Sequence, residues 1–406
     1  MPTKRVMVIG GGASGMAAAI RAGECGAQVT LLERFPKLGK KLLATGNGRC
    51  NLMNMGTARY FGQSDFAKAV LSQMPAARVL GVFRRWGLMT VQEDDGRVYP
   101  ACGQASAVLE VLKARLREQR VDVRLETEID MLTRLPNGQW CAKTTDHRDF
   151  RADACILATG GLAGGNLGCT QASYALAASN GHSVTPLFPG LAPLLTDKSM
   201  VRGLSGLRAP VIVTLMERTE PVCAAQGEML FADYGVSGIC VMQLARDAYP
   251  IVQRGGRAWL KVDFSPMLGL CPRAYGRLTI DQIPDHRQAA RALLESRARM
   301  LPKDELLLGL VPMALKTRLE RAELAELPEL LTAYSTDIKG VRSFENAQIT
   351  CGGIDTTAVD PAAMSSKICE NLYLTGELLN VDGDCGGFNL LFAFATGLIA
   401  GEKASN

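Results

Sequence analysis

The chain has 406 residues, of which 47% are hydrophobic and 21% charged; this composition is typical of folded domains, and the length allows two or three of them. Its 45 basic and 40 acidic side chains leave a net charge of +5, too close to balance to indicate a nucleic-acid-binding protein by itself. The 42 glycines exceed the roughly 28 expected of an average chain, but neither a proline excess nor a Gly-X-Y period accompanies them, which excludes collagen and low-complexity disorder.

Neither the cysteines nor the histidines are spaced as metal ligands. No two of the twelve cysteines form a C-x-x-C pair, and the three histidines lie far apart, so we expect no metal site and no redox-active cysteine pair. The apolar run at residues 6–9 is too short for a signal peptide, and no apolar stretch is long enough to span a bilayer. We therefore expect a cytoplasmic protein with reduced thiols and no membrane partner.

The chain begins with a predicted βαβ unit. Residues 6–9 form a short apolar run that is typical of a parallel strand covered on both faces. Residues 16–25 have the alanine-rich composition of a helix, and residues 28–32 form a second apolar run. Strand, helix and strand in this order predict the start of a Rossmann-type α/β domain.

The turn between the first strand and the helix has the pattern G-x-G-x-x-G, at Gly10, Gly12 and Gly15. The first glycine allows a tight turn, the second lets a pyrophosphate approach the backbone, and the third lets helix and strand pack closely. The helix N-terminus attracts phosphates, and Glu33 after the second strand can accept hydrogen bonds from a ribose. A glycine-rich turn that binds nothing is the alternative, but the complete unit favours a dinucleotide site. Its expected ligands are Gly10, Gly12, Ala13, Ser14, Gly15 and Glu33.

A basic loop follows this unit, where an ordinary NAD-binding domain would continue into another helix. Residues 34–50 contain five basic side chains and no acidic one, which suits the rest of a bulky anionic dinucleotide. A solvated basic loop is the alternative. The small and polar residues 45–51 argue against it, because they let the backbone come close to a ligand.

Residues 39–51 read Gly-Lys-Lys-Leu-Leu-Ala-Thr-Gly-Asn-Gly-Arg-Cys-Asn, and this segment resembles the HI0933-like family of FAD-dependent flavoproteins. The resemblance implies an α/β, Rossmann-like two-dinucleotide-fold domain that binds FAD non-covalently, with the flavin ring near this segment. The ligands that it implies here are Arg34, Lys41, Thr45, Gly46, Asn47, Arg49, Cys50 and Asn51.

Two further segments of the first half are expected to approach the cofactor. Residues 121–129 predict a strand, and the resemblance implies that the backbone of Ile129 contacts the adenine; a plain strand residue is the alternative. Residues 154–161 predict a buried strand that ends in Ala-Thr-Gly-Gly, an ending that resembles the second FAD motif of these folds. The contacts implied there come from Thr159, Gly160 and Gly161.

The middle of the chain has a different pattern and predicts an insert. Alternating apolar residues predict strands first, and helical spacing rich in Leu, Ala, Arg and Glu follows. The arginines of the helical part have no aromatic residues between them, so we interpret them as a solvated helix face and consider a nucleic-acid partner unlikely. The expected segments are the FAD-binding domain at 1–188, an inserted β-rich domain at 189–270, a small helical subdomain at 271–344 and the rest of the FAD-binding domain at 345–406.

The C-terminal segment completes the predicted site. Residues 371–377 predict a strand that ends in Thr-Gly-Glu, and residues 381–391 lead into an apolar helix at 392–400. The N-terminus of that helix would stabilise negative charge on the pyrimidine side of a reduced flavin. The run resembles that of the family, and its expected ligands are Gly376, Glu377, Asp382, Gly387, Phe388, Asn389 and Leu390.

A single G-x-G-x-x-G pattern argues against a dedicated nicotinamide domain. The leading hypothesis is an FAD-dependent oxidoreductase that exchanges hydride with a small or medium organic substrate. The resemblance implies two activities, reduction of an activated C=C bond with NADH or NADPH as transient donor, which we favour, and oxidation of an amine or amino-ketone by oxygen. Alternatives from other classes are an FAD protein of tRNA modification or another nucleic-acid role and an NAD-dependent dehydrogenase. No side chain is singled out as catalytic acid or base.

Overall fold

The computed structural model describes residues 3–57, 59–167 and 171–406. The chain divides into two compact units. One unit consists of Met1–Leu187 together with Ile349–Asn406, and the other of Phe188–Gln348. The second unit is therefore inserted into the sequence of the first.

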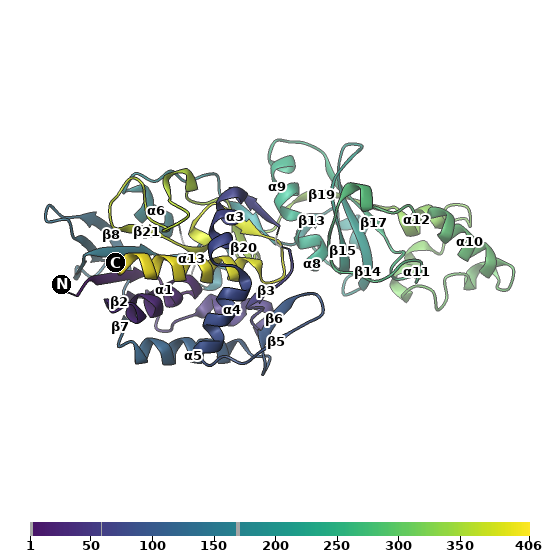
Figure 1. The fold of residues 1–406 in the computed structure, drawn as a ribbon. Helices are drawn as coiled ribbons and strands as arrows, with labels where there is room; N and C mark the ends of the chain where they lie inside the picture. The colour runs from purple at the N-terminus through teal and green to yellow at the C-terminus, as the bar shows by residue number, and fades with distance from the viewer. Residues whose placement is uncertain (1–2, 58, 168–170) are drawn as a thin grey trace. The chain divides into compact units, whose positions relative to one another are not determined.

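The centre of the first unit is a five-stranded parallel sheet in the order β21-β11-β1-β2-β7, of which Figure 1 labels β2, β7 and β21. Every pairing within it is parallel, and β1 is buried along almost its whole length, as its unbroken apolar sequence requires. Because parallel strands end at the same edge of a sheet, the segments that follow β1, β2, β11 and β21 meet at one edge. The strands are β1 (Arg5–Ile9), β2 (Gln28–Leu32), β7 (Asp122–Arg124), β11 (Ala154–Leu157) and β21 (Leu372–Leu374).

The predicted strand at residues 121–129 is in fact two strands in two sheets. The first part is β7, and the chain then turns through Glu126, whose φ of 49° is in the left-handed region. The second strand, β8 (Ile129–Arg134), pairs with β9 (Trp140–Thr144), which in turn pairs with β10 (Asp149–Ala152). Apolar residues on both sides of the turn hid this break in the sequence.

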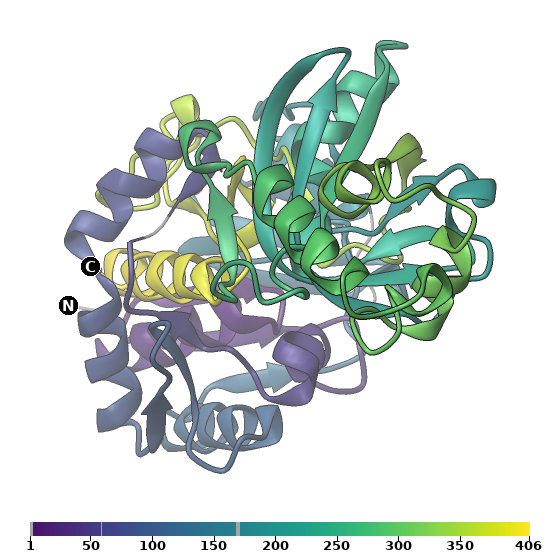
Figure 2. The same cartoon turned by 90° about the vertical axis from the view of Figure 1, so that its right-hand side faces the viewer.

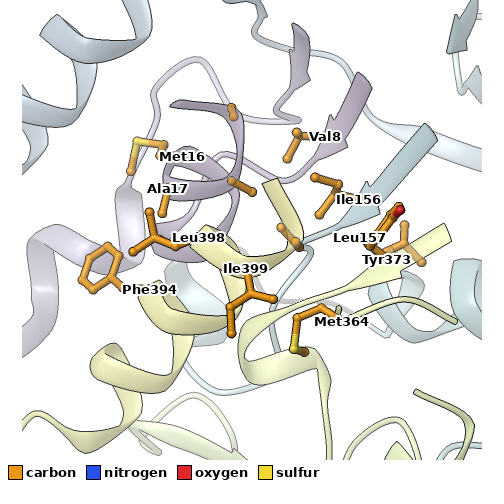
Figure 3. Packing of buried hydrophobic residues seen from close by; sticks show 14 of the residues in the cluster. Val8, Met16, Ala17, Ile156, Leu157, Met364, Tyr373, Phe394, Leu398 and Ile399 are labelled. Carbon is orange, nitrogen blue, oxygen red and sulfur yellow. The ribbon is translucent and has the colours of Figure 1, made fainter. Parts of the chain in front are cut away.

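Helices α1 (Ala13–Glu24) and α13 (Phe388–Ala404) pack against each other over the sheet. Two glycines of α13 make this close packing possible. A Cβ atom at Gly397 would lie 2.3 Å from the Ser14 carbonyl oxygen, and one at Gly401 would lie 2.3 Å from that of Ala18. In Figure 3, Leu398 lies beside Met16 and Ala17 in the core that the two helices share with the strands.

Shorter elements surround this core. A three-stranded antiparallel sheet has the order β3-β6-β5, and β4 pairs with β22. These strands are β3 (Met53–Asn54), β4 (Tyr60–Gly62), β5 (Thr90–Gln92), β6 (Arg97–Pro100) and β22 (Val381–Gly383), and β20 (Ile349–Cys351) is a further strand of the unit that belongs to neither sheet. The remaining helices of the unit are α2 (Lys40–Ala44), α3 (Ser64–Gln73), α4 (Ala76–Arg85), α5 (Ala105–Glu118) and α6 (Ala172–Ala178).

The second unit contains an antiparallel barrel. Its strands follow the order β14-β17-β19-β13-β16-β15-β18, and a further pairing of β14 with β15 closes six of them into a ring. The strands expected in the first part of the insert include β14 and β17, which pair directly with each other. The strands of the unit are β12 (Phe188–Gly190), β13 (Leu194–Thr196), β14 (Arg208–Glu217), β15 (Glu220–Ala232), β16 (Gly235–Ser237), β17 (Ala258–Asp263), β18 (Gly276–Leu278) and β19 (Tyr334–Val341).

The helices of the second unit are short, and the last three form its helical part (Figure 2). Residues 271–344, expected to be helical, also contain β18 and the barrel strand β19. No helix in the described ranges is both long and apolar enough to cross a bilayer. The predicted fold class, an α/β Rossmann-like domain with a β-rich insert and a small helical part, is confirmed. The helices are α7 (Lys198–Val201), α8 (Ile239–Met242), α9 (Ala245–Gln253), α10 (Arg287–Ala298), α11 (Met313–Leu319) and α12 (Leu327–Thr332).

Candidate cofactor site

The three glycines after β1 serve different purposes. A Cβ atom at Gly10 would lie 2.4 Å from the Ala158 carbonyl oxygen, and one at Gly15 would lie 1.8 Å from that of Gly10. The fold itself therefore requires glycine at these two positions. Gly12 has an ordinary φ of −81°, and among the described residues no atom other than those of its chain neighbours lies within 4 Å of the place where its Cβ would be. Protein packing does not explain Gly12, whereas a ligand lying against the loop would.

The N-terminus of α1 lies beside this open space and is free to meet an anion. Its N-cap, Gly12, offers no side-chain hydrogen bond, and no acidic residue occupies the first turn. The unpaired N–H groups and the partial positive charge of a helix N-terminus suit a phosphate. Ala13 and Ser14 begin the helix, and Ser14 is 6% exposed; a Cβ atom at Gly376 would lie 2.7 Å from its hydroxyl oxygen.

Glu33 follows the last residue of β2, and backbone N–H groups hold its carboxylate in place. Its two oxygens accept hydrogen bonds from the N–H groups of Gly11 at 2.7 Å and Phe35 at 2.9 Å. Each oxygen keeps a second lone pair, which a ribose hydroxyl could use. The Glu33 carbonyl also accepts a hydrogen bond from the Thr127 N–H, so the chain just before Ile129 lies next to the backbone of Glu33. The side chain of Ile129 itself is buried in the core.

The basic side chains expected to bind the dinucleotide all have carboxylate partners. The ion pair of Lys41 with Glu377 has a length of 2.6 Å and joins the basic loop to the segment after β21. Glu377 also accepts a hydrogen bond from the Thr350 N–H at 2.8 Å. The other pairs are Arg34 with Glu128 at 3.6 Å and Arg49 with Glu93 at 2.8 Å.

The Thr45–Gly48 turn and the residues after it are strongly bent. Gly46, Asn47 and Cys50 have φ values of 57°, 54° and 56°, and the Thr45 hydroxyl donates to the Leu42 carbonyl at 2.7 Å. Asn47 is exposed, whereas Cys50 is fully buried. Burial raises the pKa of the Cys50 thiol to about 11, so Cys50 stays protonated at neutral pH and is not a thiolate nucleophile.

Asn51 offers a buried polar atom to a ligand. Its Oδ1 has no hydrogen-bond partner among the described residues, and buried polar groups are rarely left in that state. A Cβ atom at Gly387 would lie 2.7 Å from this oxygen. Asn51 therefore lies directly against the residue that caps α13.

The N-terminus of α13 is the second uncapped helix end of the site. Its N-cap Gly387 has φ 102° and no side-chain cap. The Asn389 side chain closes the preceding loop through bonds to the Gly383 N–H and carbonyl, both at 2.8 Å. Asp382 is 2% exposed and accepts a hydrogen bond from the Cys351 thiol at 3.5 Å. Phe388 is buried and Leu390 half-buried.

The turn after β11 approaches the site from the other side of β1. Gly160 has φ 75° with open space at its Cβ position, and a Cβ at Gly161 would lie 2.4 Å from the Thr350 hydroxyl oxygen. Thr350, which the sequence did not single out, accepts hydrogen bonds from Leu162 and Ala163 at 2.7 and 2.9 Å. The segment that contains it, residues 349–354, resembles the return of the family's chain into the FAD domain, but that resemblance implied no contact for Thr350 itself. The Thr159 hydroxyl donates to the Ser173 carbonyl at 3.4 Å.

These features fit FAD. The open face at Gly12, the unpartnered Asn51 oxygen and the two uncapped helix ends are places where a dinucleotide would supply the missing contacts. Gly10–Gly15, Glu33 and the α1 N-terminus would hold its adenosine and phosphates, and Asn51 and the α13 N-terminus its ring. No group of three or more possible metal ligands occurs in the described part of the chain.

The fold and this site define an FAD-dependent oxidoreductase. The chain belongs to the HI0933-like family, since residues 4–403 match the HI0933-like protein Rossmann domain. It is 36% identical to the 3-dehydro-bile acid delta(4,6)-reductase of Clostridium scindens, over 99% of both chains. It is 26% identical to the ribosomal RNA dihydrouridine synthase of Haemophilus influenzae, over 96% of both. The solved structure of 3-ketosteroid delta1-dehydrogenase from Sterolibacterium denitrificans covers 100% of both chains at 13% identity with a TM-score of 0.52, a likeness of fold alone.

Proposed function

We propose that this protein reduces a carbon–carbon double bond conjugated with a ketone in an apolar organic substrate, with NADH or NADPH as electron donor. The observation that carries the proposal is the 36% identity to a 3-dehydro-bile acid delta(4,6)-reductase over 99% of both chains. A 3-dehydro steroid with double bonds at positions 4 and 6 is a conjugated ketone, so the proposed substrate class follows from the chemistry of that name.

The residues at the site would each have a part in this reaction. FAD, when bound, supplies the hydride chemistry. The α1 N-terminus and Gly12 bind the pyrophosphate, and the Glu33 carboxylate, held by two backbone N–H groups, binds the ribose. The uncapped α13 N-terminus would favour negative charge on the flavin ring. The protonated Cys50 fills the buried turn and takes no part in electron transfer.

The donor is proposed to bind only transiently. The described residues form a single parallel sheet, and the G-x-G-x-x-G pattern occurs once at its start. A nicotinamide would therefore have to reach the flavin without a Rossmann domain of its own.

Anaerobic spectroscopy of the purified protein tests the proposal. The protein should be yellow, release FAD on heating, lose its flavin absorbance with NADH or NADPH, and regain it when a 3-dehydro-Δ4,6 bile acid is added. A protein that NADH and NADPH leave oxidised, but that an amine bleaches with peroxide formed on readmission of air, would replace the reductase with the amine oxidase.

A second candidate substrate is a uridine in RNA. The observation in its favour is the 26% identity to a ribosomal RNA dihydrouridine synthase, because forming dihydrouridine also saturates a C=C bond conjugated with a carbonyl. The arginines of the helical part add no support for RNA, because two of them already have partners within the protein. Arg287 pairs with Glu329, and Arg297 donates to the Leu306 carbonyl. Dihydrouridine formed in ribosomal RNA by the reduced protein, with no turnover of the bile acid, would favour this candidate.

A further inference from the structure

One face of the small sheet β3-β6-β5 lies against the loop that leads into α13. Asn54 and Arg97 are cross-strand partners on this face. The Asn54 amide donates to the Gly386 carbonyl at 3.0 Å, and a Cβ atom at Gly386 would lie 3.7 Å from the Arg97 Nε. Gly386 precedes the N-cap of α13, so this face borders the expected place of the flavin ring.

Tyr99 lies two residues beyond Arg97 and therefore on the same face of β6. The Arg49 guanidinium lies over its ring, with the Cζ atom 4.1 Å from the ring centroid. Arg49 follows the Thr45–Gly48 turn and directly precedes the buried Cys50. The bent backbone that holds Cys50 therefore also sets the direction of the Arg49 side chain. We call Arg49, Arg97 and Tyr99 the arginine–tyrosine cluster.

The cluster offers hydrogen-bond donors. The Tyr99 side chain is only 8% exposed, and burial raises the pKa of its phenol, so the hydroxyl keeps its proton at neutral pH. In the described structure this hydroxyl forms no hydrogen bond. A guanidinium has five N–H donors, of which Arg49 uses one for Glu93 at 2.8 Å, and the contact of Arg97 with Asp95 measures 3.2 Å.

Charge and polarity favour a neutral ligand with an apolar body. Glu93 and Asp95 balance the two arginines, so the cluster has no net positive charge to attract a carboxylate or a phosphate. Val91, the cross-strand partner of Tyr99, is 53% exposed and extends the face with apolar surface. A ketone on an apolar ring system matches both properties, because its oxygen accepts hydrogen bonds without a charge.

We propose that the arginine–tyrosine cluster binds the ketone oxygen of the substrate, with Tyr99 and an arginine as donors. The inference rests on the proposed function and names the part of the site that positions its substrate. During reduction of a conjugated C=C bond, negative charge develops on the ketone oxygen, and fixed donors stabilise it more than they stabilise the neutral ketone. Solvated ion pairs at the surface are the simple alternative, and they would leave the partly buried phenol without a role.

The test compares Tyr99→Phe with Tyr373→Phe as a matched control. Both remove one hydroxyl from a side chain that is 7–8% exposed, but the Tyr373 hydroxyl donates to the Lys403 carbonyl at 3.2 Å, away from the cluster. Each holoprotein is reduced anaerobically with dithionite and mixed with a 3-dehydro-Δ4,6 bile acid, so the result does not depend on the natural donor. We expect unchanged FAD content and reoxidation by oxygen in both variants, but reoxidation by the bile acid about 100- to 1,000-fold slower in Tyr99→Phe alone.

A binding measurement separates failure of the inference from failure of the proposed function. The oxidised proteins are titrated with the saturated 3-dehydro bile acid, and the flavin absorbance reports binding. Weaker binding by Tyr99→Phe and Arg49→Gln than by the control supports the inference even if no C=C bond is reduced. Equal binding and equal reoxidation in Tyr99→Phe and the control overturn the inference and leave the proposed function intact. A wild-type protein that neither binds the ketone nor reduces the diene overturns both.

Discussion

Gly10 and Gly12 stand two residues apart in one turn, yet they are glycines for different reasons. A side chain at Gly10 would run into the Ala158 carbonyl, whereas one at Gly12 would enter open space at the N-terminus of α1. The packing around Gly10 therefore requires glycine for folding, whereas Gly12 leaves the space in which we propose that the pyrophosphate binds. The G-x-G-x-x-G pattern predicted that both glycines belong to the dinucleotide site, but it did not separate their roles. The spacing of residues carries no information about which atoms would lie opposite a Cβ atom.

This distinction predicts the behaviour of Gly12→Val. The variant should fold with a loss of no more than about 1 kcal/mol, the scale of an N-cap change, but it should retain no FAD because the side chain occupies the place of the pyrophosphate. Flavin content per protein and thermal unfolding measure the two effects. Gly81→Val, at a helical glycine whose nearest neighbour would be the Arg85 Nη1 at 3.7 Å, is the control and should keep its FAD. Normal flavin content in Gly12→Val would contradict the placement of the pyrophosphate.

Cys50 predicts a loss of stability at alkaline pH. Its pKa is about 11 in the folded protein against an ordinary 9.0, so the unfolded chain releases the proton first as the pH rises. The contribution of the Cys50 thiol to the free energy of unfolding is therefore fully present below pH 9. It falls by roughly 2 to 3 kcal/mol between about pH 9 and 11. Denaturant unfolding at a series of pH values should show that the free energy of unfolding falls less steeply in Cys50→Ala than in the wild type. In Cys102→Ser, which changes an exposed thiol, it should fall as in the wild type.

At the scale of elements, strands and helices whose sequences have a single hydrophobic period were predictable. Elements at which one hydrophobic pattern runs directly into another were not. β1, β2 and β11 followed from short apolar runs, and α13 from a long one. The division of residues 121–129 into β7 and β8 depends on the left-handed Glu126, a conformation that its residue type does not signal. Strand β19 was assigned to the helical part because its alternating pattern follows directly on a long leucine-rich stretch. Thr350 and Tyr99 contact residues that lie far from them in the sequence, and a single sequence does not reveal such contacts.

The contact of α13 with α1 predicts a large effect of Gly401→Val. A Cβ atom there would lie 2.3 Å from the Ala18 carbonyl oxygen, so the helices must separate along their interface. Overpacking of this kind typically costs 1–3 kcal/mol, and contact with backbone places the expected loss at about 3 kcal/mol or more. FAD retention should fall too, because the proposed phosphate site lies at the N-terminus of α1. Lys403→Val, which places the same side chain at an exposed position of α13, should change stability by less than about 1 kcal/mol; equal losses in the two variants would contradict this packing argument.

At the scale of the whole molecule, every residue assigned to FAD belongs to the unit formed by Met1–Leu187 and Ile349–Asn406, and the barrel unit contributes none. A ligand that binds only the folded state stabilises it by RT ln(1 + [L]/Kd), about 2.7 kcal/mol at a hundredfold excess over Kd. Two compact units with separate cores need not share that gain.

Removal of FAD should therefore act on one unit. Hydrogen exchange of the apoprotein should be faster than that of the holoprotein at residues 10–15, 39–51 and 376–390, where backbone amides and turns would face the cofactor. The barrel strands β14 and β17, which pair with each other along six residues, should exchange at the same rate in both forms. FAD removal could instead speed exchange in these strands to the same extent as at residues 10–15. That result would mean that the two units unfold together and that the insert depends on the cofactor for its stability.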